Sequence, residues 1–226
     1  MTEKIKFYFD PICPWCYQTS RWIKRLEELG DVELSWGVFS LEIQNLGKEP
    51  EELQVAHSRS ALSLRTAIKI RDEAGEKAVG AFYSAIGARI HDQAQNPKER
   101  ETVVGALTDA GLDPALADKA EADDATWDAV IAEHKQIAER TKAFGVPTIV
   151  LDDGEGPQLF GPVVYEPPDD DDEARALLEH TVWLTRYENF AELKRERTRP
   201  LELESVRQAR ERRRKRLEEE AAQQKG

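Results

Sequence analysis

Apolar and polar positions follow two different periods along the first part of the chain. Apolar side chains dominate residues 5–9, and over residues 32–38 they alternate with polar ones, so both segments are predicted strands, the second prolonged through residues 39–41. Between them, from Trp15 to Leu29, apolar residues recur at steps of three and four opposite charged residues. We therefore expect a strand, an amphipathic helix of about four turns and a second strand.

Helical spacing dominates the centre of the chain. From about residue 51 to residue 142 apolar side chains keep the three- and four-residue steps, and helices are expected to open at Asn96-Pro97, at Asp113-Pro114 and near Asp124. No internal repeat accompanies this pattern. The segment predicts a helical subdomain inserted into the fold.

The strand pattern returns after this insertion. A glycine and a proline within residues 145–147 lead into a β-branched strand that ends at Leu151, and residues 158–160 predict one more short strand. Residues 165–173 are rich in proline and aspartate, which predicts an exposed linker whose aspartates cap a final packing helix over residues 174–184. The second half of the chain thus contributes further strands and a helix to the body.

Beyond Pro200 the composition changes. Residues 201–226 hold a run of arginines followed by Glu218, Glu219 and Glu220, with scarcely any apolar side chain, so this tail cannot bury a core of its own. We favour a charged tail, helical or disordered, whose charges pair and which contacts the acidic body; an arm that binds nucleic acid or a protein partner is the alternative. No catalytic role is expected of the tail.

Length and composition limit the function. With 226 residues, 40% of them hydrophobic, the chain can bury one good core. Its formal net charge of -12 makes nucleic acid or an anionic membrane an unfavourable main partner, since like charges repel. The start lacks a basic stretch followed by an apolar one, and no window approaches the roughly 18 apolar residues of a spanning helix. We expect a soluble, cytoplasmic protein without a membrane partner; the sequence indicates no oligomeric state.

The candidate chemistry lies in the two cysteines of the chain, Cys13 and Cys16. Pro14 suits the first position of the predicted helix, where its missing N–H costs nothing, so Cys13 is expected at the N-cap and Cys16 in the first turn. The helix dipole and the first-turn N–H groups then stabilise a thiolate at Cys13. Cys13 is the expected nucleophile and Cys16 the resolving thiol, while Trp15 between them controls solvent access and offers a stacking surface to the substrate.

Other interpretations of the cysteines and histidines stay open. The cysteines are alternatively buried small residues, or half of a zinc site completed by two of the four histidines, His57, His91, His134 and His180. No second pair of ligands has metal-like spacing, so no metal is expected. His134 falls on the apolar face of a predicted helix and is expected to pack in the core. His91 ends a helix, where it either folds over the cysteines or is a cation at the helix C-terminus.

These stretches together resemble the DsbA-like branch of the thioredoxin superfamily. The resemblance rests on Cys-x-x-Cys at a helix start after the first strand, on Gly-Val-Pro-Thr at residues 145–148 before a later strand, and on the helical insertion between them. It implies an α/β, thioredoxin-like fold with a helical insertion between the second strand and the strand of the cis-proline. Residues 1–45 and 142–200 would form the thioredoxin-like domain, and residues 46–141 the inserted helical subdomain.

In that branch the proline, here Pro147, is cis and faces the cysteines. The resemblance therefore implies that backbone groups of Val146 pair with an extended substrate beside Cys13 and align its disulfide for attack. Substrate contacts are thus expected from this strand as well as from the helix start.

A closer resemblance is to the mycothiol-dependent reductases and nitroreductases, over nearly residues 4 to 200. It rests on residues 9–16, 19–23, 89–91, 159–162 and 190–195. It implies mycothiol, or another low-molecular-weight thiol, as reductant, no tightly bound cofactor and, in some members, reduction of nitro compounds without a flavin. The site residues expected from the motifs and the resemblance are Cys13, Pro14, Trp15, Cys16, Asn45, His91, Val146 and Pro147. Residues 46–60 depart from the family pattern and border the expected pocket.

The function expected from these features is thiol-disulfide oxidoreduction. Cys13 attacks a disulfide or a small electrophilic acceptor such as a nitro compound, Cys16 resolves the adduct, and a low-molecular-weight thiol restores the dithiol. One alternative is an enzyme like 2-hydroxychromene-2-carboxylate isomerase or the kappa-class transferases, which bind a thiol cofactor without cycling a cysteine pair; the intact pair disfavours it. The other is a non-enzymatic redox sensor or partner-binding module.

Overall fold

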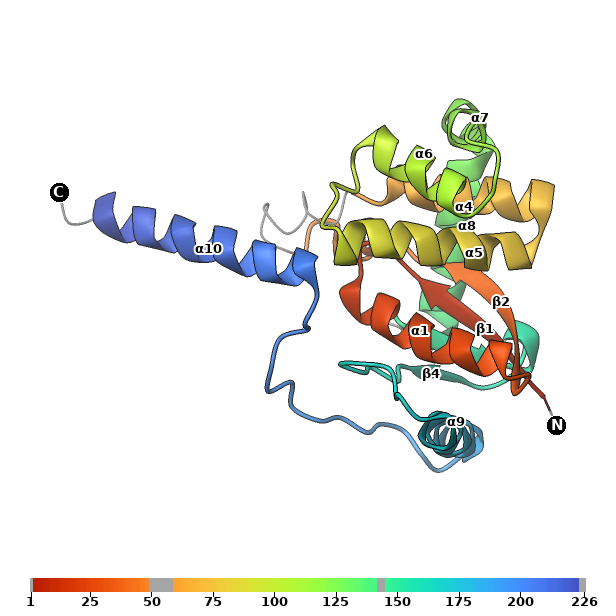
Figure 1. Ribbon diagram of the computed structural model, residues 1–226. Helices are drawn as coiled ribbons and strands as arrows, with labels where there is room; N and C mark the ends of the chain where they lie inside the picture. Colours follow the sequence, from red (N-terminus) through yellow and green to blue (C-terminus); the bar gives the residue numbers. More distant parts are fainter. Residues whose placement is uncertain (1, 49–58, 142–144, 224–226) are drawn as a thin grey trace.

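The structure is a computed structural model that describes residues 2–48, 59–141 and 145–223. A four-stranded sheet in the order β2-β1-β3-β4 stands at its centre (Figure 1). β1 (Glu3–Phe9) and β2 (Val32–Val38) pair in parallel, and β3 (Thr148–Leu151) runs antiparallel to β1 and to β4 (Gln158–Phe160). Because a parallel pair needs a crossover, α1 (Pro14–Glu28) connects β1 to β2 along the sheet.

Helices cover both faces of the sheet, because its strands are buried on both sides. Phe7 and Phe9 of β1 pack with Trp36 of β2 against Tyr83, and the rings of Phe9 and Tyr83 stack at 4.0 Å. Lys6 points to the opposite face and pairs with Glu133 (3.2 Å). The helices that carry Tyr83 and Glu133, α5 (Glu76–Gly87) and α8 (Asp124–Thr141), therefore lie on opposite faces of the sheet.

The predicted helical insertion between the second strand and the cis-proline strand is confirmed. Its described elements are α2 (Leu41–Asn45), α4 (Ala61–Ala74), α5 (Glu76–Gly87), a π-helical turn η1 (Ala88–Asp92), α6 (Arg100–Asp109), α7 (Leu116–Ala122) and α8 (Asp124–Thr141). After β3 come a 3-10 turn η2 (Asp152–Gly154), then β4, α9 (Asp171–Arg186) and α10 (Glu204–Gln223). The boundaries of the inserted subdomain, residues 46–141, stay a prediction.

Several element ends differ from those the pattern predicts. The extension of the second strand through residues 39–41 is wrong, because the Ser40 hydroxyl accepts a hydrogen bond from the N–H of Ile43 (3.2 Å) and caps α2. Helices α6 and α7 begin a few residues after the Asn-Pro and Asp-Pro pairs, whose side chains close short turns instead. The predicted aspartate cap of α9 is confirmed at Asp170. The predicted helix start at residues 51–58 lies outside the described residues.

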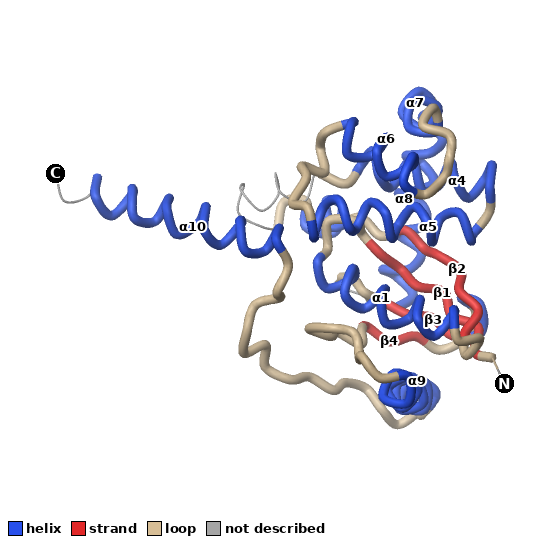
Figure 2. The backbone as a smooth tube through the Cα atoms, in the orientation of Figure 1, coloured by secondary structure: helices blue, strands red, loops and turns tan. Residues whose placement is uncertain are grey.

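The chain after β4 is less exposed than a linker and a separate tail would be. Tyr165 is only partly exposed, because its ring packs edge-on against Trp15. After α9 the chain returns in an extended segment towards the start of α1 (Figure 2), and Leu201 and Leu203, each 5% exposed, pack against Tyr17. The first residues of the predicted tail therefore belong to the body.

The last helix matches the charge-paired helix that the composition predicts. α10 projects away from the body, and none of its residues is buried (Figure 1). Its charges pair along the helix at three- and four-residue spacing, as in Arg207–Glu204, Arg214–Glu218 and Arg216–Glu220. Among the helices described, none is long and apolar enough to cross a bilayer.

Gly87→Ala is expected to destabilise the fold by about 1–3 kcal/mol. A helical Gly→Ala change ordinarily stabilises by up to about 1 kcal/mol. Here the added Cβ would lie 2.5 Å from Cδ2 of Tyr17, whose buried ring cannot move without disturbing its stacking on His91. Urea unfolding of the variant measures the effect. Gly105→Ala is the control, since the atoms nearest to its added Cβ belong to the end of the long, flexible Arg89 side chain; equal stability of the two variants would contradict the argument.

Candidate active site

The first turn of α1 carries both cysteines, directly after β1. The Asp10 carbonyl accepts a hydrogen bond from the N–H of Cys13 (3.0 Å), which turns the chain into the helix. Cys13 is the N-cap with extended backbone (φ -82°, ψ 109°), and Pro14 follows at the start of the helix. The Cys13 Sγ accepts a hydrogen bond from the N–H of Cys16 (3.4 Å). The predicted N-cap is thus confirmed, and its sulfur lies at the positive end of the helix dipole.

Burial distinguishes the two thiols. Both cysteines are free; Cys13 is 6% exposed and Cys16 is 0% exposed. Burial raises the pKa of the Cys16 thiol well above its ordinary value, and the hydrogen bond with Cys13 raises it further. Cys13 is therefore the less buried of the two thiols, whereas burial keeps Cys16 protonated.

The strand after the insertion meets the cysteines at its start. The Val146–Pro147 peptide bond is cis, as the resemblance implies. The Cys13 thiol donates a hydrogen bond to the Val146 carbonyl (3.5 Å), and the Pro147 carbonyl accepts one from the N–H of Gly161 (2.9 Å). The structure therefore gathers Cys13, Cys16, Val146 and Pro147. That Val146 pairs with an extended substrate stays a prediction.

Asp10 is a buried acid beside this centre that was not among the predicted site residues. Its carboxylate accepts hydrogen bonds from the N–H groups of Leu41 (2.8 Å) and Ile12 (3.1 Å) and from the hydroxyl of Ser60 (3.0 Å). Burial nevertheless raises the pKa of Asp10 to about 7, against these stabilising bonds. Its negative charge in turn helps to raise the pKa of Cys16. A lone acid in an apolar run before the cysteine pair was the available signal.

Tyr83 is a second buried ionisable group that sequence reasoning missed. Its ring stacks on Phe9, and its buried hydroxyl interacts with the side chain of Ser20. Burial raises the pKa of Tyr83 well above its ordinary value, and the charges of Cys16 and Cys13 add to this. The phenol therefore stays neutral and presents a dipole next to the sulfurs.

His91 supports the cysteine loop instead of covering it. Its Nε2 lies 2.9 Å from the Pro11 carbonyl and its Nδ1 lies 3.2 Å from the Ser205 hydroxyl. A carbonyl only accepts, so Nε2 carries the proton and the hydroxyl of Ser205 donates to Nδ1. Burial lowers the pKa of His91 to about 4. The alternative of a helix-end cation is therefore wrong; a role of His91 in binding substrate stays a prediction.

The chain was compared with known protein families and curated proteins. A model described as "Mycothiol-dependent nitroreductase Rv2466c" matches residues 12–195, which include both cysteines and the cis-proline. The chain belongs to the Rv2466c-like family. Rv2286c of Mycobacterium tuberculosis (strain ATCC 25618 / H37Rv), described as uncharacterized, is 35% identical to this Rv2466c-like chain over 172 residues, covering 73% of this chain and 70% of that protein.

Solved structures share the fold of this Rv2466c-like protein. The cytosolic disulfide reductase DsbM from Pseudomonas aeruginosa superposes with a TM-score of 0.58 at 19% identity, covering 80% of this chain and 99% of that chain; it has also been solved with GSH. A 2-hydroxychromene-2-carboxylate isomerase reaches a TM-score of 0.57 at 16% identity, covering 80% of this chain and 94% of that one. The fold is therefore thioredoxin-like in its DsbA-like form, and it is shared by proteins with different activities.

Asn45 and His134 are the other residues for which the sequence predicts a place or a role. Asn45 is the last residue of α2, the helix whose first N–H, at Leu41, binds Asp10; its role in binding substrate stays a prediction. His134 is 4% exposed and its Nδ1 accepts a hydrogen bond from the N–H of Ser40 (3.4 Å), so its predicted place in the core is confirmed. Within residues 2–48, 59–141 and 145–223, no three His, Cys, Asp or Glu side chains gather into a group that could hold a metal ion.

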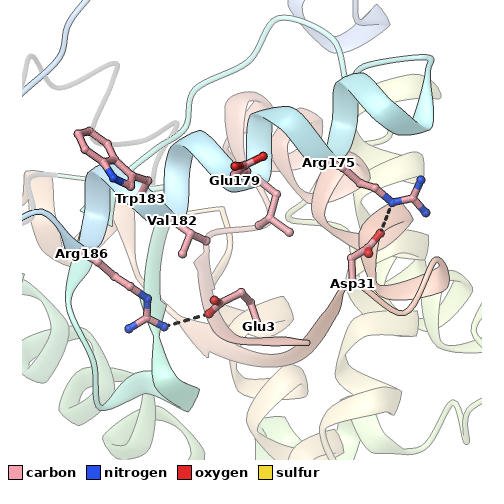
Figure 3. Close-up of a pocket in the computed structure, with 8 residues that line it drawn as sticks. Glu3, Asp31, Arg175, Glu179, Val182, Trp183 and Arg186 are labelled. Atoms are coloured by element: carbon pink, nitrogen blue, oxygen red, sulfur yellow. Dashed lines mark hydrogen bonds and ion pairs between the residues drawn. The ribbon is translucent and has the colours of Figure 1, made fainter. Parts of the chain in front are cut away.

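A surface hollow of about 500 Å³ lies at the other end of the sheet in this Rv2466c-like protein (Figure 3). On α9, Arg175 pairs with Asp31 (2.8 Å) and Arg186 pairs with Glu3 (3.0 Å), so four of the charged side chains around it pair with one another. Glu3 begins β1, whereas the cysteines follow the last residue of that strand, roughly 20 Å away for a seven-residue strand. We assign this hollow no part in the thiol chemistry.

Proposed function

We propose that this protein is a thiol-disulfide oxidoreductase that cycles the Cys13–Cys16 pair. The observation that carries the proposal is a sulfur at a helix N-terminus, at Cys13, backed by a second, more deeply buried sulfur in the same turn, at Cys16. The dipole and the N–H of Cys16 stabilise the Cys13 thiolate, which attacks. The buried position of Cys16 places it to attack only a neighbour, namely the mixed disulfide at Cys13.

The cycle balances in electrons and protons. The Cys13 thiolate forms a bond to one substrate sulfur, and the other sulfur leaves as a thiolate. Cys16 then loses its proton and attacks Cys13 Sγ, which releases the second substrate sulfur and leaves a protein disulfide. With a nitro acceptor the same two electrons, with two protons, reduce the nitro group to a nitroso group and water. Two molecules of a low-molecular-weight thiol restore the dithiol and become a disulfide themselves.

Mycothiol is the reductant that we propose. The description of the matching family model supports it, and the fold relative solved with GSH supports a small thiol as partner in this fold. A reducing cytoplasm fits this chemistry, since a dithiol cycled by a small thiol works where thiols are kept reduced. Disulfides and small nitro compounds are the acceptors that we propose.

A 2-hydroxychromene-2-carboxylate isomerase shares the fold, so the fold does not decide between an oxidoreductase and an isomerase-like enzyme. What favours oxidoreduction is the second sulfur, Cys16, since a cofactor-binding isomerase has no use for a resolving thiol. A non-enzymatic sensor would keep the cysteine pair but would show no turnover. Catalysis therefore separates all three.

The proposed function is tested by turnover of bis(2-hydroxyethyl) disulfide and of a nitroaromatic dye with mycothiol, glutathione or dithiothreitol as reductant. We expect turnover with mycothiol at least about tenfold faster than with glutathione, a difference of ~1.4 kcal/mol in transition-state binding. Dithiothreitol serves as the control that the cysteine pair is active. Turnover with none of the three would overturn the oxidoreductase; equal rates with mycothiol and glutathione would overturn the choice of reductant.

A further inference from the structure

Residues 197–205, here called the C-terminal strap, cross the rim of the active site and run from the extended segment after α9 into the first turn of α10. The guanidinium carbon of Arg197 lies 4.7 Å from the centroid of the Trp15 ring, and Ser205 binds His91. The family match ends at residue 195, so the strap lies outside the matched residues. It brings side chains of this particular protein onto the residue between the two cysteines.

Arg197 contacts the ring of Trp15 and has no carboxylate as an ion-pair partner among the described residues. In the described part of the chain no Asp or Glu lies within ion-pair distance of it, whereas Arg199 on the same strap pairs with Glu166 (3.0 Å). Arg21, on the second turn of α1, binds the neutral amide of Gln18 (3.2 Å), and its guanidinium lies over the Tyr17 ring. Among the described residues, Arg197 therefore brings a guanidinium without a carboxylate partner onto Trp15, the residue that precedes Cys16.

The position of Arg197 suits recognition of an anion. A guanidinium that stacks on an indole is fixed by its flat face and keeps its N–H edge free for hydrogen bonds. That edge fits a carboxylate or sulfonate in a two-pronged arrangement. The whole chain carries a formal net charge of -12, which repels an anionic substrate. A cation on Trp15 offsets this repulsion locally, near the cysteine pair.

We infer that Arg197 recognises a carboxylate or sulfonate on the disulfide that Cys13 attacks, and so makes the enzyme selective for anionic acceptors. The inference rests on the proposed function and names its substrate class. In the attack the Cys13 thiolate bonds to the near sulfur and the far sulfur leaves as a thiolate. Cys16 then attacks Cys13 Sγ and displaces the second thiolate, which takes up the proton that Cys16 loses. The anionic group stays on Arg197 while the bond forms, and Trp15 supports the guanidinium from behind.

The test compares two chromogenic disulfides of opposite type, the dianion 5,5′-dithiobis(2-nitrobenzoate) and the uncharged 4,4′-dithiodipyridine. The reduced wild type, Arg197→Ala and Arg195→Ala are mixed with each, and the release of aromatic thiol is followed in a stopped-flow instrument. Arg195 is exposed on the same segment and makes none of the described contacts, so its variant loses the same charge without touching Trp15. We expect Arg197→Ala to slow the reaction with the dianion about tenfold and with the neutral disulfide less than about twofold.

Each outcome decides something. Arg195→Ala should change both rates by less than about twofold; if it slows the dianion as much as Arg197→Ala does, the effect belongs to overall charge and the inference is wrong. Equal loss on both disulfides for Arg197→Ala would make Arg197 a structural support of Trp15. If the wild type reacts with both disulfides and Arg197→Ala keeps the same ratio of the two rates, only the role of Arg197 is refuted. Wild type that reacts with neither refutes the proposed function, and the inference with it.

Discussion

Cys13→Ser is expected to lower disulfide turnover by about 10³-fold or more, to the level of the uncatalysed reaction. Cys13 is the less buried of the two thiols, and its sulfur caps the N-terminus of α1, where it accepts a hydrogen bond from the N–H of Cys16. A serine hydroxyl keeps the cap but is not ionised at neutral pH, so the helix should form and the chemistry should stop. Thermal unfolding close to that of the wild type would show that the loss is chemical.

Cys16→Ser is the matched control, because it removes the other sulfur from the same turn. Cys13 should still attack, but nothing then resolves the adduct, so one equivalent of substrate thiol is released and a mixed disulfide accumulates. Mass spectrometry of the intact protein should find the adduct on Cys16→Ser and none on Cys13→Ser. An adduct on Cys13→Ser would reverse the two roles. Multiple turnover by Cys16→Ser with a small thiol would mean that the thiol itself resolves the adduct.

The sheet and the cysteine helix were predictable because local rules determine them. Alternation in residues 32–38 and the proline at position 14 each fix a conformation within a few residues, and the structure has β2 and the N-cap where they indicate. Ser40 shows the limit of the same reasoning. The apolar run continues past it, but a hydroxyl that caps the next helix outweighs the strand pattern.

The rest of the site depends on contacts between residues far apart in the sequence. Burial lowers the pKa of His91, and its ring bonds Pro11 on one side and Ser205 on the other, 114 residues further along the chain. Leu201 and Leu203 stand in a charged segment with no period of their own, so their burial on Tyr17 has no local signal. Arg197 is likewise one arginine among many until the fold places it on Trp15. Composition therefore predicts that residues 201–205 are part of a solvated tail, whereas in the structure they pack on Tyr17 and bond His91.

Asp10→Asn is expected to flatten the dependence of stability on pH. Burial raises the pKa of Asp10 from the ordinary 3.8 to about 7, so between these values the folded protein binds a proton that the unfolded chain has released. Stability from this group is therefore present at pH below about 4 and is lost as the pH rises to about 7. At ~1.4 kcal/mol for each pH unit the total is roughly 4 kcal/mol, of which about 2.5 kcal/mol falls between pH 5 and pH 8.

The slope with pH, and not the stability at one pH, is the diagnostic quantity. In Asp10→Asn an NH₂ group takes the place of one carboxylate oxygen, so either the N–H of Ile12 or that of Leu41 faces a donor and loses its acceptor. This lowers the stability of the fold by about 1–3 kcal/mol at every pH. Urea unfolding at pH 5 and pH 8 should nevertheless show the wild type losing about 2.5 kcal/mol more than Asp10→Asn across the interval. Asp128→Asn removes an exposed carboxylate and should keep the slope of the wild type. Parallel curves for wild type and Asp10→Asn would mean that Asp10 is ionised throughout, and that Cys16 lies beside a permanent negative charge.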